Sequence, residues 1–249
     1  MDYNIIIFII FGFIAQMIDG ALGMGYGVSS TTFFLSLGIP PAIASACVHT
    51  SEMFTTAVSG LSHFKFGNVD RKIFVRLLIP GVIGGILGAY ILTELPGGKI
   101  KPFVSIYLLI MGFMIILKVF KKIKKTKKEA NLIPLGLVGG FFDAIGGGGW
   151  GPIVTTTLVA GGNTPRFAIG SVNSAEFFVT MFESITFFAM IGALLVQHWE
   201  KIVGLIIGGV LAAPLAAYIC KRIPSRALMI LVGLLIIGLS IRTLYLAWL

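Results

Sequence analysis

Charged residues are scarce in this sequence. Asp, Glu, Lys and Arg make up 12% of its 249 residues, whereas 57% are hydrophobic, and the mean hydropathy is +0.99. A soluble domain carries about 25% charged residues, because it must present a polar surface to water. A chain with so little charge cannot hide this much apolar surface in one water-soluble core, and lipid removes that requirement. The composition therefore predicts an integral membrane protein.

Cysteine and histidine are also rare. The two cysteines, Cys47 and Cys220, lie inside apolar stretches, which is typical of reduced packing residues and not of a disulfide framework. The three histidines form no HExxH motif, and the chain has no CxxC motif or metal-spaced cluster. Its glycine runs lie between apolar segments and lack the strand–helix context of a dinucleotide site. We therefore expect no enzyme activity, no metal site and no cofactor.

The positive charge of the chain is concentrated beside its apolar segments. The formal net charge is +9, and six of the nineteen Lys and Arg residues lie between Lys121 and Lys128. No basic face interleaved with aromatic residues is present, so a nucleic-acid partner is not expected. Basic loops next to apolar spans are typical of the cytoplasmic side of a bilayer. The pattern predicts a multi-pass protein whose partner is the lipid bilayer and whose basic linker is cytoplasmic.

Six segments have close to the ~20 apolar residues that a ~30 Å hydrocarbon layer requires. They cover roughly 42–64, 73–93, 103–120, 167–195, 202–220 and 227–248. Two further apolar stretches, 5–37 and 132–160, are interrupted by the runs DGALGMGYG (Asp19–Gly27) and DAIGGGGWG (Asp143–Gly151). Such glycine-dense runs do not hold a helix. The flanking pieces, such as 5–17 and 28–37, look too short to cross alone, which favours re-entrant hairpins.

The two interrupted stretches are copies of one another. An offset of 124 residues (143 − 19) aligns Gly12–Thr56 with the second stretch without a gap. It superimposes Tyr26 on Trp150, Pro41 on Pro165 and Glu52 on Glu176. We therefore predict an internal duplication within one membrane domain. Its parts are an N-terminal repeat over 1–122, a basic linker over 123–131 and a C-terminal repeat over 132–249.

Loop charge predicts how the two repeats are oriented. If each interrupted stretch is a hairpin that returns to its own side, fourteen basic loop residues share one side and three lie on the other. If each stretch crosses once, the repeats are parallel and the division becomes eleven against six. The positive-inside rule favours the first arrangement. The predicted fold is all-α and integral to the membrane, with two inverted repeats, each a Gly-broken re-entrant hairpin followed by three transmembrane helices.

Non-helical backbone at membrane depth is tolerated where protein or a water-filled cavity satisfies it, so paired breaks indicate a central site. Helix starts after each break offer amide groups that bind anions, and hydroxyls follow them. The predicted substrate-binding residues here are Gly23, Gly25, Tyr26, Gly27, Ser29, Ser30, Thr31, Gly147, Gly149, Trp150, Gly151, Thr155 and Thr156. The alternative is that the glycines serve close helix packing and the hydroxyls bond neighbouring helices.

A second polar group lies inside the helices predicted after Pro41 and Pro165. It comprises His49 and Glu52 in the first copy and Asn173, Ser174 and Glu176 in the second. A carboxylate within a span costs roughly 2.5 kcal/mol or more, so it is a functional candidate by default. We predict that Glu52 and Glu176 couple proton uptake to transport, while His49, Asn173 and Ser174 contact substrate. The alternative is that each Glu is a hydrogen-bonded structural anchor.

Other acidic and amide residues rank lower as site candidates. Glu183 lies further along the same predicted helix as Glu176 and has no acidic counterpart in the first copy. Gln16, Asp19 and Asp143 are candidates for orienting the glycine turns, and the two aspartates fit equally well as residues that cap the ends of helices.

At these residues the sequence resembles the sulfite exporter TauE/SafE family of membrane transporters. The resemblance rests on Asp19–Gly27, the junction Gly38–Pro41, the Glu52 helix, the stretch Phe66–Asp70 and the second copy from Gly139 to Glu176. It covers essentially the whole chain. It implies a carrier in the plasma membrane, linked to export of sulfite, sulfonates or related organosulfur anions.

Together these features predict a secondary transporter that exports a small organosulfur or carboxylic anion by alternating access around the two hairpins, coupled to protons. A passive anion channel, an importer of the same anions and a structural membrane subunit are the alternatives. The anion, the direction, the coupling ion and the oligomeric state, a homodimer included, stay open at this stage.

Overall fold

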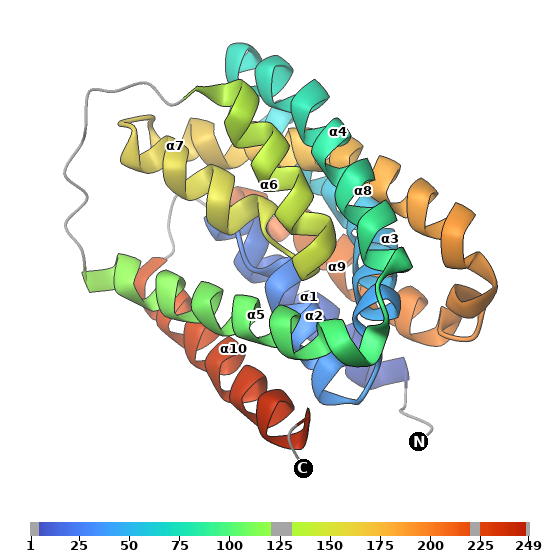
Figure 1. Ribbon diagram of the computed structural model, residues 1–249. Helices are drawn as coiled ribbons and strands as arrows, with labels where there is room; N and C mark the ends of the chain where they lie inside the picture. The colour runs from blue at the N-terminus through green and yellow to red at the C-terminus, as the bar shows by residue number, and fades with distance from the viewer. Residues whose placement is uncertain (1–4, 121–130, 220–224, 248–249) are drawn as a thin grey trace.

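In the computed structural model, residues 5–120, 131–219 and 225–247 are described, and these ranges contain helices and their connections but no strand (Figure 1). The predicted linker over 123–131 lies outside them except for Asn131, as does Cys220. The elements are α1 (Ile5–Leu22), α2 (Tyr26–Ser36), α3 (Pro41–Lys65), α4 (Arg71–Glu94), α5 (Gly97–Phe120), α6 (Leu132–Gly146), a π-helical turn η1 (Gly151–Thr155), α7 (Thr156–Ala160), α8 (Pro165–Val196), α9 (Trp199–Ile219) and α10 (Ser225–Ala247).

Six of these helices are long and apolar enough to cross a membrane. They are α1, α4, α5, α8, α9 and α10. Each of the six predicted spans coincides with one helix, from α3 to α10, to within a few residues. The helix α3 has sufficient length but is not among the six apolar ones, because a row of Ser, Thr, His and Glu side chains lowers its hydropathy.

The first helix corrects one expectation. The piece before the first break was predicted to be too short to cross a membrane, but α1 has 18 residues and a hydropathy of 2.3. The prediction was wrong because Asp19 does not end the helix, which continues to Leu22. The chain turns at Gly23, where φ is +66°, a value that glycine adopts without the steric cost of a Cβ. The helix of the second copy that corresponds to α1 is α6, which is shorter, with 15 residues.

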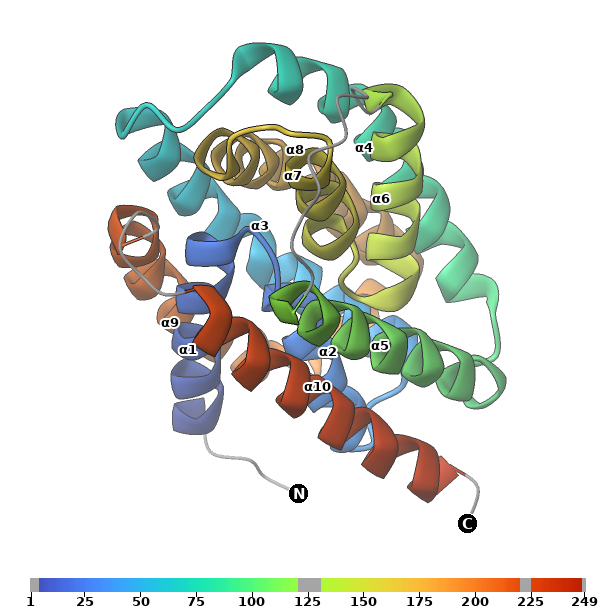
Figure 2. The same ribbon diagram turned by 90° about the vertical axis from the view of Figure 1, so that its left-hand side faces the viewer.

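Corresponding helices of the two copies pack against each other. The helix α3 packs on α8, and α5 lies alongside α10 (Figure 2). Each pair is antiparallel. Ser59 near the end of α3 contacts Asn173 near the start of α8. Gly112 of α5 lies beside Ile236 of α10, whereas the later residue Ile116 lies beside the earlier Gly233. The first helix of each copy packs on the opposite copy, α1 on α9 and α6 on α4. Exchanging the two copies leaves these main helix contacts unchanged.

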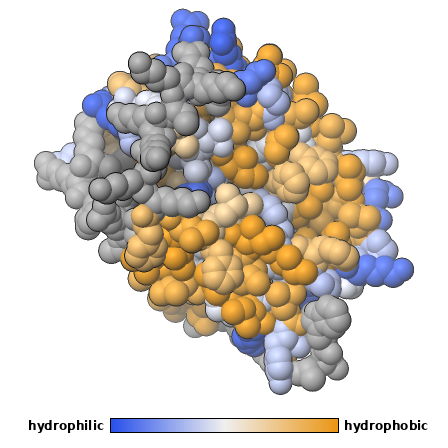
Figure 3. Space-filling view, turned by 60° about the vertical axis from the view of Figure 1, so that its left-hand side comes forward, coloured by the Kyte–Doolittle hydropathy of each residue, from blue (hydrophilic) through white to orange (hydrophobic). Residues whose placement is uncertain are grey.

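Apolar side chains cover much of the outer surface, and the interior contains many polar side chains beside its apolar core. Exposed residues include Ile79 and Ile83 of α4, Phe113 of α5 and Leu234 of α10. In Figure 3 hydrophobic residues cover the middle of the visible face, and hydrophilic residues gather at its margins. Such a surface is stable against lipid tails, not against water. The buried polar set is correspondingly large, and it includes Gln16, Asp19, Ser29, Ser30, Thr31, His49, Glu52, Asp143, Asn173, Glu176 and Glu183.

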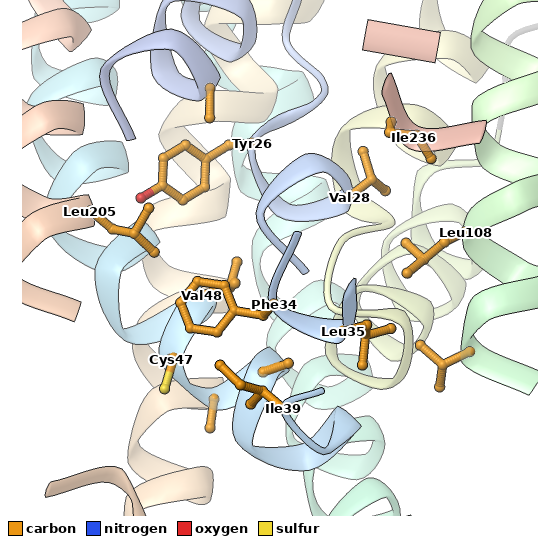
Figure 4. Packing of buried hydrophobic residues seen from close by; sticks show 14 of the residues in the cluster. Tyr26, Val28, Phe34, Leu35, Ile39, Cys47, Val48, Leu108, Leu205 and Ile236 are labelled. Carbon is orange, nitrogen blue, oxygen red and sulfur yellow. The ribbon is translucent and has the colours of Figure 1, made fainter. Parts of the chain in front are cut away.

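The helix α2 lies at the centre of the molecule. Ten of its eleven residues are buried, so this helix presents almost nothing to the surroundings. Figure 4 shows Tyr26 directed toward Leu205 of α9 and Val28 directed toward Ile236 of α10. Non-helical backbone that faced lipid would leave its N–H and C=O groups without hydrogen-bond partners, and enclosure by protein avoids that cost. The first break is therefore enclosed by other helices.

Candidate functional site

The two Gly-rich breaks begin with the same turn but then differ, because Gly25 and Gly148 have positive φ while their equivalents Gly149 and Met24 do not. Gly23 and Gly147 occupy equivalent positions and have φ values of +66° and +65°. Gly38 and Gly162, at the ends of the segments that follow the breaks, also correspond, with φ values of +88° and +98°. The offset of 124 residues found in the sequence thus holds for the local structure. Beyond the breaks the copies differ, because α2 is a continuous α-helix whereas its counterpart begins with the π-helical turn η1.

The two breaks lie against each other. Thr31 donates a hydrogen bond to the carbonyl of Gly147 at 2.5 Å, and its counterpart Thr155 donates to the carbonyl of Gly23 at 2.7 Å. The backbones are close enough that a Cβ on Gly27 would lie 2.7 Å from the Cα of Gly148. The sequence placed these residues in one site without showing contact between them. The structure brings them together but uses both threonine hydroxyls for the contact itself.

Two aspartates bind the backbone amides at the breaks. The Oδ1 atom of Asp143 accepts hydrogen bonds from the amides of Gly149 at 2.6 Å and Trp150 at 2.9 Å. In the first copy, Oδ1 of Asp19 accepts from the amide of Tyr26 at 3.4 Å. These amides were predicted to bind an anion, and in this conformation carboxylates of the protein hold that position. A substrate anion would share these amides with the aspartates or displace them.

One aromatic side chain lies near the end of each break and packs against the opposite copy. The indole nitrogen of Trp150 donates to the carbonyl of Val172 at 3.2 Å, and its ring fills the space beside Gly81 of α4. The equivalent Tyr26 packs beside Gly209 of α9. Trp150 is therefore hydrogen-bonded within the protein, whereas the buried hydroxyl of Tyr26 has no hydrogen-bond partner.

Ser29 and Ser30 remain the available hydroxyls of the first break. Both side chains are buried at the start of α2, and neither Oγ has a hydrogen-bond partner. An unpaired buried hydroxyl costs about 1–3 kcal/mol, so such groups are uncommon without a role. In the second copy, the hydroxyl of Thr156 donates to Pro152 and accepts from Lys118. Of the predicted hydroxyl ligands, Ser29 and Ser30 are thus without a hydrogen-bond partner in this conformation, as is Tyr26.

The predicted proton-coupling residues are buried at the interface of α3 and α8. Glu52 and Glu176 are 2% and 3% exposed. Thr56 donates to the carbonyl of Glu52, and the equivalent Thr180 donates to the carbonyl of Glu176. The two threonine hydroxyls lie 3.5 Å apart, so the equivalent positions of the copies meet here. Oε2 of Glu52 has no hydrogen-bond partner.

The other predicted polar residues divide into bonded and unbonded groups. Asn173 accepts a hydrogen bond from Ser59 at 2.8 Å, and Ser174 donates to the carbonyl of Gly170 within its own helix. Ser174 also lines a cavity of about 570 Å³ between α3, α4 and α8. The lining of that cavity is mostly apolar, and the Gly-rich breaks are not part of it. By contrast, Nε2 of His49 has no hydrogen-bond partner.

Sequence reasoning ranked Glu183 and Asp143 low and did not predict that they lie beside His49. Both lie near His49: its Nε2 is 3.1 Å from Oε2 of Glu183 and 3.6 Å from Oδ2 of Asp143. The three side chains come from α3, α6 and α8, and each is at most 2% exposed. Spacing along the chain could not reveal the group, because its members belong to different helices. The only signal in the sequence was Glu183, a carboxylate inside an apolar segment that has no acidic counterpart in the first copy.

Two cations that sequence reasoning did not consider are hydrogen-bonded to the segments after the breaks. Lys118 of α5 donates to the carbonyl of Pro152 at 3.1 Å and to the hydroxyl of Thr156. Arg242 of α10 lies 124 positions further on and donates to the carbonyl of Ser36 at 2.5 Å, at the end of α2. Each therefore ties the last helix of one copy to a segment that follows a break. The duplication could have identified this pair as matched charges within apolar spans.

Comparison with known proteins places the chain among membrane transporters. Residues 8–243 match the family described as "Sulfite exporter TauE/SafE". The chain is 42% identical to the "Probable membrane transporter protein YtnM" of Bacillus subtilis, over 98% of this chain and 84% of that protein. It is 25% identical to the "Sulfite exporter TauE/SafE family protein 3" of Arabidopsis thaliana, over 37% of this chain and 19% of that protein. No solved structure matches the chain.

Proposed function

Because the chain belongs to the sulfite exporter TauE/SafE family of membrane transporters, we propose that it is a secondary transporter exporting a small anion. The class comprises sulfite, sulfonates and other organosulfur or carboxylic anions. The observation that carries the proposal is the meeting of the two Gly-rich breaks at the buried centre, with Ser29 and Ser30 unpartnered beside them. Membrane transporters bind substrate at such broken helices near the interface of their repeats.

The anion binds where the amides and hydroxyls of the two breaks converge. The start of α2 carries a partial positive charge from the aligned peptide dipoles, which suits a small oxyanion without a buried arginine. Ser29, Ser30 and Tyr26 offer hydroxyl donors that the protein leaves unpaired. Asp19 and Asp143 hold the amides while substrate is absent. Substrate binding then requires these carboxylates to share or release the amides.

Transport proceeds by alternating access between two inverted repeats, 1–122 and 132–249. The antiparallel packing of α3 on α8 and of α5 on α10 supports this symmetry, because parallel repeats would align these pairs in the same direction. Contact between the two predicted cytoplasmic loops supports it too: Arg166 donates to the carbonyls of Phe66 and Gly67. The segments 5–37 and 132–160 act as the hairpins around which the repeats rock.

Proton coupling runs through Glu52 and Glu176. Both carboxyl groups are buried at the contact between the copies, and no Lys or Arg side chain within the described residues forms an ion pair with either. A carboxyl group at such a place exchanges a proton when the site opens to water on one side of the membrane. The protein resides in the plasma membrane with its basic linker in the cytoplasm, and its partners are the anion, protons and lipid.

Flux into proteoliposomes tests this proposal. We expect saturable movement of radiolabelled sulfite or a sulfonate, accelerated by a pH gradient across the membrane. Glu52→Gln and Glu176→Gln remove a titratable proton and should abolish the acceleration by the gradient. The control is Glu200→Gln, an exposed carboxylate at the start of α9, which should transport like the wild type.

Several results would contradict the proposal. Folded protein that moves none of these anions would refute the substrate class. Conduction without saturation or counterflow would indicate a passive channel, and a strict preference for inward flux would indicate an importer. Full stimulation by the gradient in both Gln variants would remove Glu52 and Glu176 from the coupling mechanism.

A further inference from the structure

We propose that His49, Asp143 and Glu183 form a binding site for a divalent transition-metal ion at the centre of the membrane domain. The site joins α3, α6 and α8. Its three potential ligand atoms, one from each side chain, all lie within 4.8 Å of one another. Metal binding is a separate property from anion transport, and each can be measured without the other.

The distances between the donor atoms are compatible with a shared metal ion as well as with direct ion pairs. A metal ion at about 2.1 Å from each of its N and O donors holds those donors roughly 3.0–3.5 Å apart. Nε2 of His49 lies 3.1 Å from Oε2 of Glu183 and 3.6 Å from Oδ2 of Asp143. Only small side-chain movements would bring all three atoms into a coordination shell.

Each donor atom points into the group without a hydrogen-bond partner. Nε2 of His49, Oδ2 of Asp143 and both carboxylate oxygens of Glu183 are buried and form no hydrogen bond, and Nε2 lies within ion-pair distance of both carboxylates. No Lys or Arg within the described residues forms an ion pair with Asp143 or Glu183. Leaving several polar atoms of one cluster unsatisfied is costly in a low-dielectric interior. A bound cation satisfies all of them together.

The orientation of His49 leaves Nε2 free to bind a metal. Its Nδ1 lies 2.7 Å from the carbonyl oxygen of Ser45, which can only accept a hydrogen bond. Nδ1 therefore carries the hydrogen, and in the neutral ring Nε2 carries the lone pair. A backbone carbonyl behind the second ring nitrogen is the usual outer partner of a histidine that binds a metal. Asp143 is held similarly, since its Oδ1 binds the amides of Gly149 and Trp150 while Oδ2 points to the group.

The duplication supplies an internal reference for this group. The equivalents of His49, Asp143 and Glu183 are Asn173, Asp19 and Ser59, by the offset of 124. Asn173 donates to the carbonyl of Ile169, just as His49 donates to Ser45. However, Ser59 donates to Asn173 at 2.8 Å, so these two neutral side chains satisfy each other. The group around His49 has an imidazole and a second carboxylate, which together with Asp143 make a set of metal ligands. The equivalent group around Asn173 has an amide and a hydroxyl at those places.

The donor set selects the class of ion. One imidazole with two carboxylates suits Zn²⁺, Mn²⁺ or a similar transition metal, whereas Mg²⁺ and Ca²⁺ prefer oxygen donors alone. A divalent ion also cancels the formal charge of the two carboxylates. Three protein ligands leave a coordination position open, as in catalytic zinc sites. On the basis of the proposed function, the transported anion would bind the metal at this open coordination position.

Metal binding by the purified full-length chain tests the inference directly. The protein, stripped by a chelator in detergent, is titrated with Zn²⁺ by calorimetry, and its thermal unfolding is followed with Zn²⁺, Mn²⁺, Mg²⁺ and Ca²⁺. We expect one equivalent of Zn²⁺ to bind and to raise the unfolding temperature, because a ligand of the folded state stabilises it. Co²⁺ should show the visible absorption of a site with a nitrogen ligand. None of these readouts depends on transport.

Glu183→Gln is the decisive variant. Neither oxygen of Glu183 accepts a hydrogen bond in the structure, so an amide of the same shape removes the charge, and with it the ion pair to His49, without breaking a hydrogen bond. We expect it to weaken Zn²⁺ affinity by at least about tenfold, the lower end of what an outer-shell change costs. His49→Gln should do the same. Glu200→Gln and His198→Gln, outside the group and at the start of α9 or just before it, are matched controls that should bind as the wild type does.

Two results would overturn the inference. One is folded wild-type protein that binds neither Zn²⁺ nor Mn²⁺, which would make His49 and Glu183 an ion pair only. The other is Glu183→Gln protein, with the elution profile of the wild type, that binds Zn²⁺ with unchanged affinity. Should Glu183→Gln fail to fold, loss of the Co²⁺ absorption in folded His49→Gln protein would support the site, and its retention would overturn it.

Discussion

At the scale of single residues, a hydroxyl beside a break can serve the substrate or the fold. Thr31 and Thr155 were predicted as substrate ligands from their positions, yet each donates to the carbonyl of the opposite break. Ser29 and Ser30 come from the same short segment and have no partner. Sequence position alone could not separate these two roles, because the acceptors of the threonines come from the other half of the chain.

Thr31→Val and Thr155→Val should therefore act on stability. Each replacement keeps the branched shape and removes one buried interaction, at a cost of about 1 kcal/mol, or more because the carbonyl loses its partner. We expect lower unfolding temperatures for the purified variants in detergent. Thr157→Val is the control, because its exposed hydroxyl bonds only the carbonyl of Ile153 in its own helix. Unchanged stability together with weaker substrate binding would instead assign the hydroxyls to the substrate.

At the scale of elements, the breaks depend on glycine because two backbones cross there. Gly148 has a φ of +147°, and a Cβ at this position would overlap the amide nitrogen of Val28. The second hairpin is also held from outside by Lys118, which donates to the carbonyl of Pro152. The crossing is therefore held by two features, the close contact of the two backbones and the hydrogen bond from Lys118 of α5.

Gly148→Ala should disrupt this crossing. The substitution adds the strain of a conformation that L-residues avoid, and it forces the hairpins apart. We expect a strong loss of stable monodisperse protein in detergent, measured by size-exclusion chromatography and thermal unfolding. Gly238→Ala in α10 is the matched control, because nothing lies within 4 Å of the added Cβ. Wild-type behaviour of Gly148→Ala would show that the hairpins do not cross as closely as described.

At the scale of the whole molecule, the two copies are intertwined, because the first helix of each copy packs on the other copy. The helix α1 of the first copy packs on α9 of the second, and α6 of the second packs on α4 of the first. Each hairpin therefore packs partly on helices of the other copy. The loop after α3 and the start of α8 lie at the same end of the molecule, joined by Arg166 and Phe66. Inverted repeats require both to face the same side of the membrane.

Cysteine accessibility checks this topology. In a background without Cys47 and Cys220, single cysteines at exposed Lys65 and Thr164 should react with an impermeant maleimide from the cytoplasmic side. Cysteines at exposed Gly98 and Glu200 should react from the opposite side. The two pairs act as controls for one another. Labelling of position 164 from the same side as position 98 would contradict the inverted arrangement and favour parallel repeats.

The sequence alone determined the membrane environment, the helices and the duplication. Each of these depends on local composition: apolar runs of sufficient length, glycine where the helix stops, and matched residues at a constant offset. The close agreement between Gly23 and Gly147 in φ shows how well that information survives in the structure. The continuation of α1 beyond Asp19 was missed, because an aspartate fits both inside a helix and at its end.

Only the tertiary structure decided which polar residues meet. His49, Asp143 and Glu183 belong to three helices, and no spacing along the chain relates them. The same applies to Thr31 and the carbonyl of Gly147. Helix formation follows from neighbours in sequence, whereas the polar centre forms when helices of both copies pack and leave certain donors and acceptors facing one another. That packing separates groups without a hydrogen-bond partner, such as the hydroxyls of Ser29 and Ser30, from groups that the fold has already satisfied.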